Sequence, residues 1–164
     1  MKKLTVIPLL ALLGFVLFFC SSSRVAERWI PVFMERSELE RSVSFDNKSR
    51  EMRNPGKIYV RGTEIFVNEK YKGVHIIDNS DPFAPDQKAF IVAPGCIDMA
   101  VKGNVIYLDN AVDLVAFDLD TKTVTHRIKE LLPEHRSPDG SIFYADDRPE
   151  GYILVGWKEI NDND

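Results

Sequence analysis

Five acidic and amide residues crowd into one short stretch of the chain, and their oxygens are of the kind that calcium prefers as ligands. They are Asp109, Asn110, Asp113, Asp118 and Asp120. A calcium-binding EF-hand loop places oxygen ligands at alternate positions, with a glycine in the middle and a glutamate at the end. This stretch has a different spacing, so the sequence favours aspartates that accept backbone N–H groups in turns.

The residue types of a serine hydrolase occur together in a second polar stretch. His135, Ser137 and Asp139 are close neighbours in the sequence, whereas the members of a catalytic triad usually converge from separate elements. We therefore expect an exposed loop between strands. His75 and His126 lack the histidine and cysteine spacings of a zinc site. The sequence thus predicts no catalytic residue, no metal ligand and no cofactor.

The chain has two cysteines, Cys20 and Cys96. Apolar residues flank Cys96, and the sequence places no base near it. A nucleophilic cysteine needs a base and an electropositive environment. We therefore expect Cys96 to be a buried structural thiol.

The surroundings of Cys20 are those of a secretory signal. Lys2 and Lys3 precede an apolar run from Leu4 to Phe19, and the polar run Ser21–Ser23 follows Cys20. The apolar run is shorter than the roughly 20 residues of a membrane-spanning helix. It is therefore typical of the apolar region of a signal peptide.

A cysteine directly after such a run resembles a bacterial lipobox. The resemblance implies that residues 1–19 are a signal peptide and that Cys20 carries a diacylglycerol, with palmitate-like chains holding the protein on a membrane. Ser21 replaces the aspartate that usually retains lipoproteins in the inner membrane, which favours the outer membrane. Phe19 is larger than the residue usual before the cysteine, and the alternatives are an uncleaved anchor or ordinary secretion.

Composition and charge exclude one class of partner. The chain has 45% hydrophobic and 28% charged residues, as expected for a folded domain. Its formal net charge is −4, and basic and acidic residues alternate along it. Nucleic-acid binding needs clustered lysine and arginine, so we expect no nucleic-acid partner.

Short runs of β-branched and aromatic residues, separated by glycine and proline, dominate the chain after Asn54. The predicted strands are Lys57–Val60, Glu64–Val67, Val74–Ile77, Ala89–Val92, Val105–Leu108, Leu114–Phe117 and Thr123–Thr125. Many short strands at even spacing predict an all-β fold. Before them, the tether and entry segment 20–53 is expected to hold a short helix at Glu35–Arg41 and a strand at Ser42–Phe45.

An internal repeat narrows the fold. The stretch Val60–Asn68 matches Val101–Asp109 at a spacing of 41 residues, and Gly73–Asp78 matches Asp113–Asp118 at a spacing of 40. One residue is therefore lost between the two matches. A period near 40 fits a four-stranded propeller blade. We expect the shared glycine to form a hairpin turn and the closing aspartate to form an Asx-turn.

The two copies resemble LVIVD-repeat proteins, a propeller-like family found in bacterial surface lipoproteins. Val74–Asp78 and Leu114–Asp118 carry the motif, and Asn54–Tyr59, Lys72–Asn79 and Asp98–Gly103 are similar to a lipoprotein branch of that family. The resemblance covers roughly residues 53–157. It implies an incomplete propeller of about two to three blades in residues 54–164, after an N-terminal signal helix and a short entry helix.

A third group of strands is expected at Ser141–Ala145 and Tyr152–Trp157. Propellers have about 4–8 blades, so two or three blades leave open faces and strand edges. Three accounts follow: the chain is the front part of a longer reading frame, it closes a ring by oligomerising, or it folds as a small sheet packed on its entry helix.

These observations predict a function without naming a ligand. We expect a lipid-anchored binding or scaffolding module at the cell envelope, which binds an envelope protein or a glycan and self-associates through open blade edges. One alternative is a truncated remnant of a longer propeller lipoprotein, without independent function. A second alternative is part of an envelope enzyme, although we expect no enzymatic activity.

Overall fold

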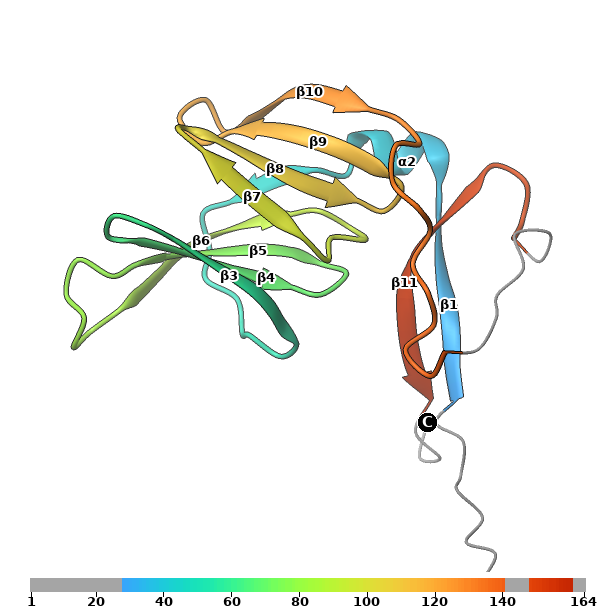
Figure 1. The fold of residues 1–164 in the computed structure, drawn as a ribbon, viewed down its shortest axis with the longest axis horizontal. Coiled ribbons are helices and arrows are strands. Elements are labelled where there is room, and N and C mark those ends of the chain that lie inside the picture. Colours follow the sequence, from blue (N-terminus) through green and yellow to red (C-terminus); the bar gives the residue numbers. More distant parts are fainter. Residues whose placement is uncertain (1–27, 141–147, 161–164) are drawn as a thin grey trace, which may run out of the picture.

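The computed structural model describes residues 28–140 and 148–160, and β-strands make up most of their regular structure (Figure 1). These strands form three antiparallel sheets, and none of the sheets closes on itself within the described residues. The all-β prediction is therefore confirmed at this level. The predicted signal peptide and Ser141–Ala145 lie outside the described residues.

The first sheet has five strands and the second sheet has four. In spatial order, the first sheet contains β2 (Ser44–Asp46), β6 (Asp86–Val92), β5 (Gly73–Asp78), β4 (Glu64–Glu69) and β3 (Pro55–Arg61). The second sheet contains β10 (Thr123–Ile128), β9 (Asp113–Asp118), β8 (Val105–Asn110) and β7 (Met99–Lys102). All seven strands predicted between Lys57 and Thr125 lie within these elements.

The internal repeat has a matching strand register in the two sheets. Ile58 pairs with Val67, and 41 positions later Met99 pairs with Leu108. The shared glycines, Gly62 and Gly103, have φ angles of +58° and +59° and begin two-residue turns. A positive φ at the first turn position suits a type II′ hairpin, where glycine carries no steric cost.

The turns also locate the residue that the second copy lacks. The turn between β4 and β5 has three residues, Lys70–Lys72, whereas the turn between β8 and β9 has only Ala111 and Val112. The predicted Asx-turns are present as well. The Asp78 carboxylate accepts the Ser80 N–H at 2.9 Å, and the Asp118 carboxylate accepts the Asp120 N–H at 3.0 Å.

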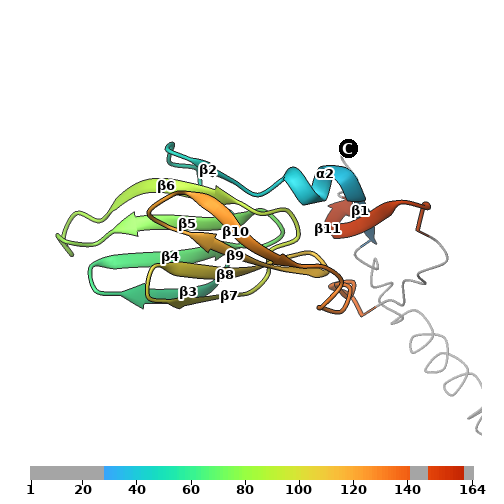
Figure 2. The ribbon, with the colours of Figure 1, turned by 90° about the horizontal axis from the view of Figure 1, so that it is seen from above.

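The main core lies between the first and second sheets, which stack face to face (Figures 1 and 2). Strands β3 and β7 lie side by side at one edge of the stack. The buried side chains are Phe66, Val74, Ile76, Ala89, Ile91 and Ala93 from the first copy and Cys96, Met99, Val101, Ile106, Leu108 and Phe117 from the second. Burial of these apolar side chains stabilises the stack by about 1.5–3 kcal/mol for each large one.

The third sheet is a two-stranded ribbon, here called the terminal ribbon. It pairs β1 (Arg28–Glu35) with β11 (Tyr152–Ile160), and it lies beside the ends of the other two sheets (Figure 1). The prediction of a strand at Tyr152–Trp157 is therefore confirmed. The described part of this third strand group pairs with β1, which lies in the segment that we expected to be a tether.

The entry helix α2 (Arg36–Arg41) begins one residue later than predicted. A helix of six residues has little stability of its own, and Leu39 holds it in place by packing, fully buried, against Ala111, Val112, Ile153 and Val155. No helix among the described residues is long and apolar enough to cross a membrane.

Candidate functional site

The acidic and amide residues between Asp109 and Asp120 make separate structural contacts instead of converging on one site. The Asp109 carboxylate accepts the Asp98 N–H at 2.8 Å, and the Asn110 side-chain amide donates to the Pro94 carbonyl at 2.7 Å. Asp118 closes its Asx-turn. Within residues 28–140 and 148–160, no group of three or more histidine, cysteine or acidic residues is placed to hold a metal ion.

Asp113 has the strongest set of partners in this group. Its carboxylate accepts two hydrogen bonds from Arg36, at 2.9 and 3.0 Å, and one from Arg127 at 2.7 Å. Burial by itself raises the pKa of this carboxyl, but the bonds from Arg36, the Glu130 N–H and Arg127 overcome that effect and hold the pKa below its ordinary value. Asp113 thus ties β9 to the entry helix.

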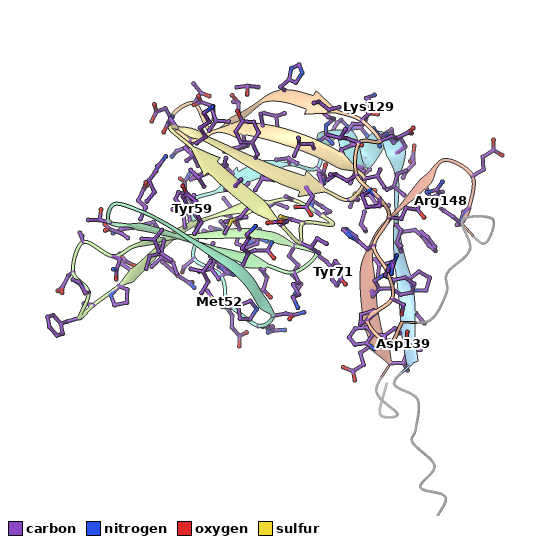
Figure 3. The ribbon with its side chains drawn as sticks, in the orientation of Figure 1. Met52, Tyr59, Tyr71, Lys129, Asp139 and Arg148 are labelled. Carbon is purple, nitrogen blue, oxygen red and sulfur yellow. The ribbon has the colours of Figure 1, made fainter. Side chains whose placement is uncertain are left out.

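The polar segment around His135 is an irregular loop between β10 and β11, as predicted, and Arg136, Pro138 and Asp139 in it are exposed. His135 and Ser137 are buried, His135 Nε2 lies 2.7 Å from the Gly95 carbonyl oxygen, and the Ser137 hydroxyl donates to Asp139. Burial lowers the pKa of His135. Tyr71, which Figure 3 labels, packs on His135 with ring centroids 5.5 Å apart. The predicted exposure was wrong for His135, because Gly95 and Tyr71 contact its side chain.

Cys96 is fully buried, as predicted, while Cys20 lies outside the described residues. Burial, reinforced by the nearby Asp109 carboxylate, raises the pKa of the Cys96 thiol well above its ordinary value. The Asn68 amide donates to the Cys96 carbonyl and sulfur at 3.3 and 3.2 Å. Because thiolate is the reactive form of cysteine, this environment keeps Cys96 unreactive.

Asn68 and Glu69 form a buried polar cluster that the sequence analysis missed. Glu69 accepts the Arg53 and Asn54 N–H groups, at 3.1 and 2.8 Å, and lies 3.3 Å from His75 Nε2. The cluster fixes the chain where it enters β3. The signal that could have revealed it is the recurrence of two polar residues at the end of each β4-like strand, Asn68–Glu69 and Asp109–Asn110.

A pocket of about 230 Å³ lies over the second sheet beside Lys57 of β3; we call it the open-face pocket. Its lining residues Ala100 and Tyr107 alternate along their strands with core residues, so the pocket opens mainly on the face of the second sheet that points away from the first. Its lining residues are Lys57, Asp98, Met99, Ala100, Tyr107, Asp109, Leu114 and Leu132. Lys57 and Asp98 form an ion pair of 2.7 Å in its wall. Burial raises the pKa of Asp109, although backbone N–H bonds oppose the shift.

The open-face pocket suits binding of an apolar group. Methionine, leucine and tyrosine side chains supply apolar surface, and the Lys57–Asp98 pair and the Asp109 carboxyl supply a few polar atoms. Ligand pockets commonly combine these two features. Cys96, His135, Ser137 and Asp139 are not among its lining residues. Of the candidate residues of the sequence analysis, the structure therefore places Asp109 at this pocket.

We compared the chain with models of protein families, with curated proteins and with solved structures, and none of the three comparisons gave a match.

Proposed function

We propose that this chain is an outer-membrane lipoprotein, anchored through Cys20, whose propeller-like repeat region binds or scaffolds an envelope protein or a glycan. The observation that carries the proposal is the stack of two sheets with matching register and a hollowed outer face. Propellers stack four-stranded sheets in this way and present rigid surfaces to ligands. In this reading, the first and second sheets are two LVIVD-like blades of an incomplete propeller.

The anchor supports the envelope location. The sequence places Cys20 directly after the apolar run Leu4–Phe19, and β1 begins only eight residues later, at Arg28. A short tether would hold the folded module close to the membrane surface. Acylation with two or three chains is sufficient for stable attachment.

The first test addresses the anchor. Cells that express the full chain are fed radiolabelled palmitate, and the label on the protein is measured for the wild type, Cys20→Ser and Cys96→Ser. We expect the label to disappear only in Cys20→Ser, because Cys96 is buried in the core. Equal labelling of the wild type and Cys20→Ser, or no label at all, would refute the lipoprotein assignment.

The second test addresses binding at the open-face pocket. A photo-crosslinking amino acid is placed at Ala100, an exposed residue of the pocket, or at Phe83, which is 99% exposed on the hairpin between β5 and β6. We expect a crosslink to an envelope protein or glycan from position 100 and none from position 83. Identical adducts at both positions, or none at either, would contradict a binding role for the pocket.

A further inference from the structure

The two repeat sheets meet through two different faces. We call the face of the first sheet that packs on the second its leading face; it carries Phe66, Val74 and Ile76. We call the opposing face of the second sheet its trailing face; it carries Met99, Val101, Ile106, Leu108 and Phe117. The contact between the sheets is thus a leading face against a trailing face.

The repeat places the same two faces on the outside of the stack. At positions equivalent to Phe66, Val74 and Ile76, the outward face of the second sheet carries Tyr107, Leu114 and Ala116. This is an open leading face, and the open-face pocket is part of it. At positions equivalent to those of the trailing face, the outward face of the first sheet carries Ile58, Val60, Ile65, Val67 and Ile77.

Strand register makes this equivalence close. Across the second sheet, Val101 pairs with Ile106 and Ile106 with Phe117. Across the first sheet, Val60 pairs with Ile65 and Ile65 with Ile77 in the same way. The open trailing face therefore repeats the apolar row that is already packed in the core.

Both open faces expose apolar side chains. Ile58 and Val60 are 62% and 60% exposed, and Tyr107 is 37% exposed. The β3 side of the trailing face, with Ile58 and Val60, is open, whereas Val67 in its middle is only 5% exposed and Arg50 covers the β6 side by stacking on Phe90 at 4.5 Å. Contiguous exposed apolar surface on a soluble module commonly marks an interaction site.

The charges around the inner edge fit the same pairing. Lys57 and Asp98, 41 positions apart in the repeat, form an ion pair between the two sheets. If the first sheet of another copy packed on the outward face of the second sheet, Asp98 would occupy the position equivalent to Lys57. It would then face the Lys57 side chain of that other copy. Arg61 donates to the Gly103 carbonyl, and its equivalent, the exposed Lys102, would face the carbonyl of Gly62.

We propose that a second copy of this chain docks the exposed β3 side of its trailing face onto the open leading face of the first copy, reproducing the part of the contact between the two sheets that Met99 and Val101 make. The inference rests on the propeller-like part of the proposed function and names a second copy of this chain as the envelope protein that binds over the open-face pocket. The contact is heterologous, so its repetition gives a closed ring or an open filament. Ile58 of the second copy then lies over the open-face pocket. Its equivalent Met99 packs on the leading face of the first sheet in the same way within one chain.

The test is sedimentation velocity of the full chain in a density-matched non-ionic detergent, over a range of protein concentrations. Val60→Lys blocks the trailing face and Tyr107→Glu blocks the leading face. Phe83→Lys, on an exposed hairpin tip, is the matched control. Circular dichroism checks that each variant keeps its β-sheet signal.

We expect the wild type and Phe83→Lys to form dimers and larger assemblies as the concentration rises. Each face variant alone should be monomeric, with a dissociation constant raised at least about tenfold, because docking would bury an unpaired charge. An equimolar mixture of the two variants should form a one-to-one dimer that grows no further, because each variant retains one intact face.

Three outcomes would overturn the proposal: a wild type that is monomeric at all concentrations, face variants that associate like the wild type, or a mixture that forms no heterodimer. The milder Lys102→Glu should weaken association without introducing a charge into the apolar contact, so a misfolded Val60→Lys would not remove the test. A monomeric wild type would leave the palmitate label of Cys20 unchanged, so the two proposals fail separately.

Discussion

The first and second sheets share the same hairpin register, but the chain that enters β3 and the chain that enters β7 are held by hydrogen bonds of opposite direction. At the end of β4, the Glu69 carboxylate accepts the Arg53 and Asn54 N–H groups of the incoming chain. At the equivalent end of β8, the Asn110 amide donates to the Pro94 carbonyl of its own incoming chain. A buried polar group needs a partner, but either member of the pair can be the donor. The repeat therefore conserves the position of the hydrogen bond and not the residue.

A second contrast lies at the start of the next strand, where the equivalent residues are Gly73 and Asp113. A Cβ atom on Gly73 would lie 1.9 Å from the Ile91 carbonyl oxygen, so the backbone itself fills this space. In the second sheet, Asp113 occupies the position and reaches Arg36 and Arg127. Among the described residues, Asp113 thus ties the second sheet to the entry helix by charge, whereas Gly73 at the equivalent position of the first sheet lies close to the backbone of β6.

The largest expected effect on stability is at Gly73, where the backbones of β5 and β6 lie close together. Gly73→Ala should lower the free energy of unfolding by about 5 kcal/mol, because the added methyl group overlaps backbone atoms and φ is +143°. Urea denaturation measures it. Gly62→Ala is the matched control: its φ is also positive, but nothing lies near its Cβ position, so it should cost only about 1 kcal/mol. Equal losses would show that the backbone contact is not the cause.

A smaller effect on stability is expected at Asp113, which occupies the position equivalent to Gly73 and forms ion pairs there. Asp113→Asn should lower the free energy of unfolding at pH 7 by about 3 kcal/mol, because it leaves two partly buried arginines without a carboxylate. A carboxyl with a lowered folded-state pKa stabilises the fold above its unfolded pKa of about 4, and this stabilisation is lost as the pH falls through the folded pKa. The difference between variant and wild type should therefore shrink in acid. A constant difference between pH 7 and pH 3 would contradict this explanation.

The smallest effect is expected at Asp109, and its pH dependence should have the opposite sign. Burial raises the pKa of this carboxyl, so its contribution to stability is present below about pH 4 and is lost as the pH rises through the folded pKa. Asp109→Asn should change the free energy of unfolding by less than about 1 kcal/mol and should gain on the wild type between pH 4 and pH 7. Chemical denaturation at both pH values measures this, and a relative loss over that range would refute the assignment.

The repeat region was the most predictable part of the fold because its signals are local. Alternating apolar residues and the turn glycines Gly62 and Gly103 mark the strands and hairpins without reference to the rest of the chain. Asp78 and Asp118 likewise form turns with residues two positions away. Such contacts depend on short-range backbone geometry, which the sequence encodes directly.

Most of the contacts that were missed join parts of the chain that lie far apart in the sequence. The partners of β1 lie in β11, at the other end of the described chain, and the sequence analysis predicted no strand at residues 28–35. His135 and Ser137 are polar by composition, and only the assembled fold buries them. The open-face pocket was not foreseen either, because Lys57, Tyr107 and Leu132 line it from separate parts of the chain.

The pairing of β1 with β11 also sets an order of assembly. Hairpins such as β3–β4 and β7–β8 join neighbours in the sequence and can form within microseconds. The terminal ribbon joins Arg28 to Ile160, so it can form only after β11 has been synthesised, and contacts so distant in sequence form slowly. Until then, Leu39 and Ala111 lack the Ile153 and Val155 side chains that bury them. A nascent chain therefore exposes an apolar surface at the ends of its sheets. Molecular chaperones that recognise such surfaces would bind there.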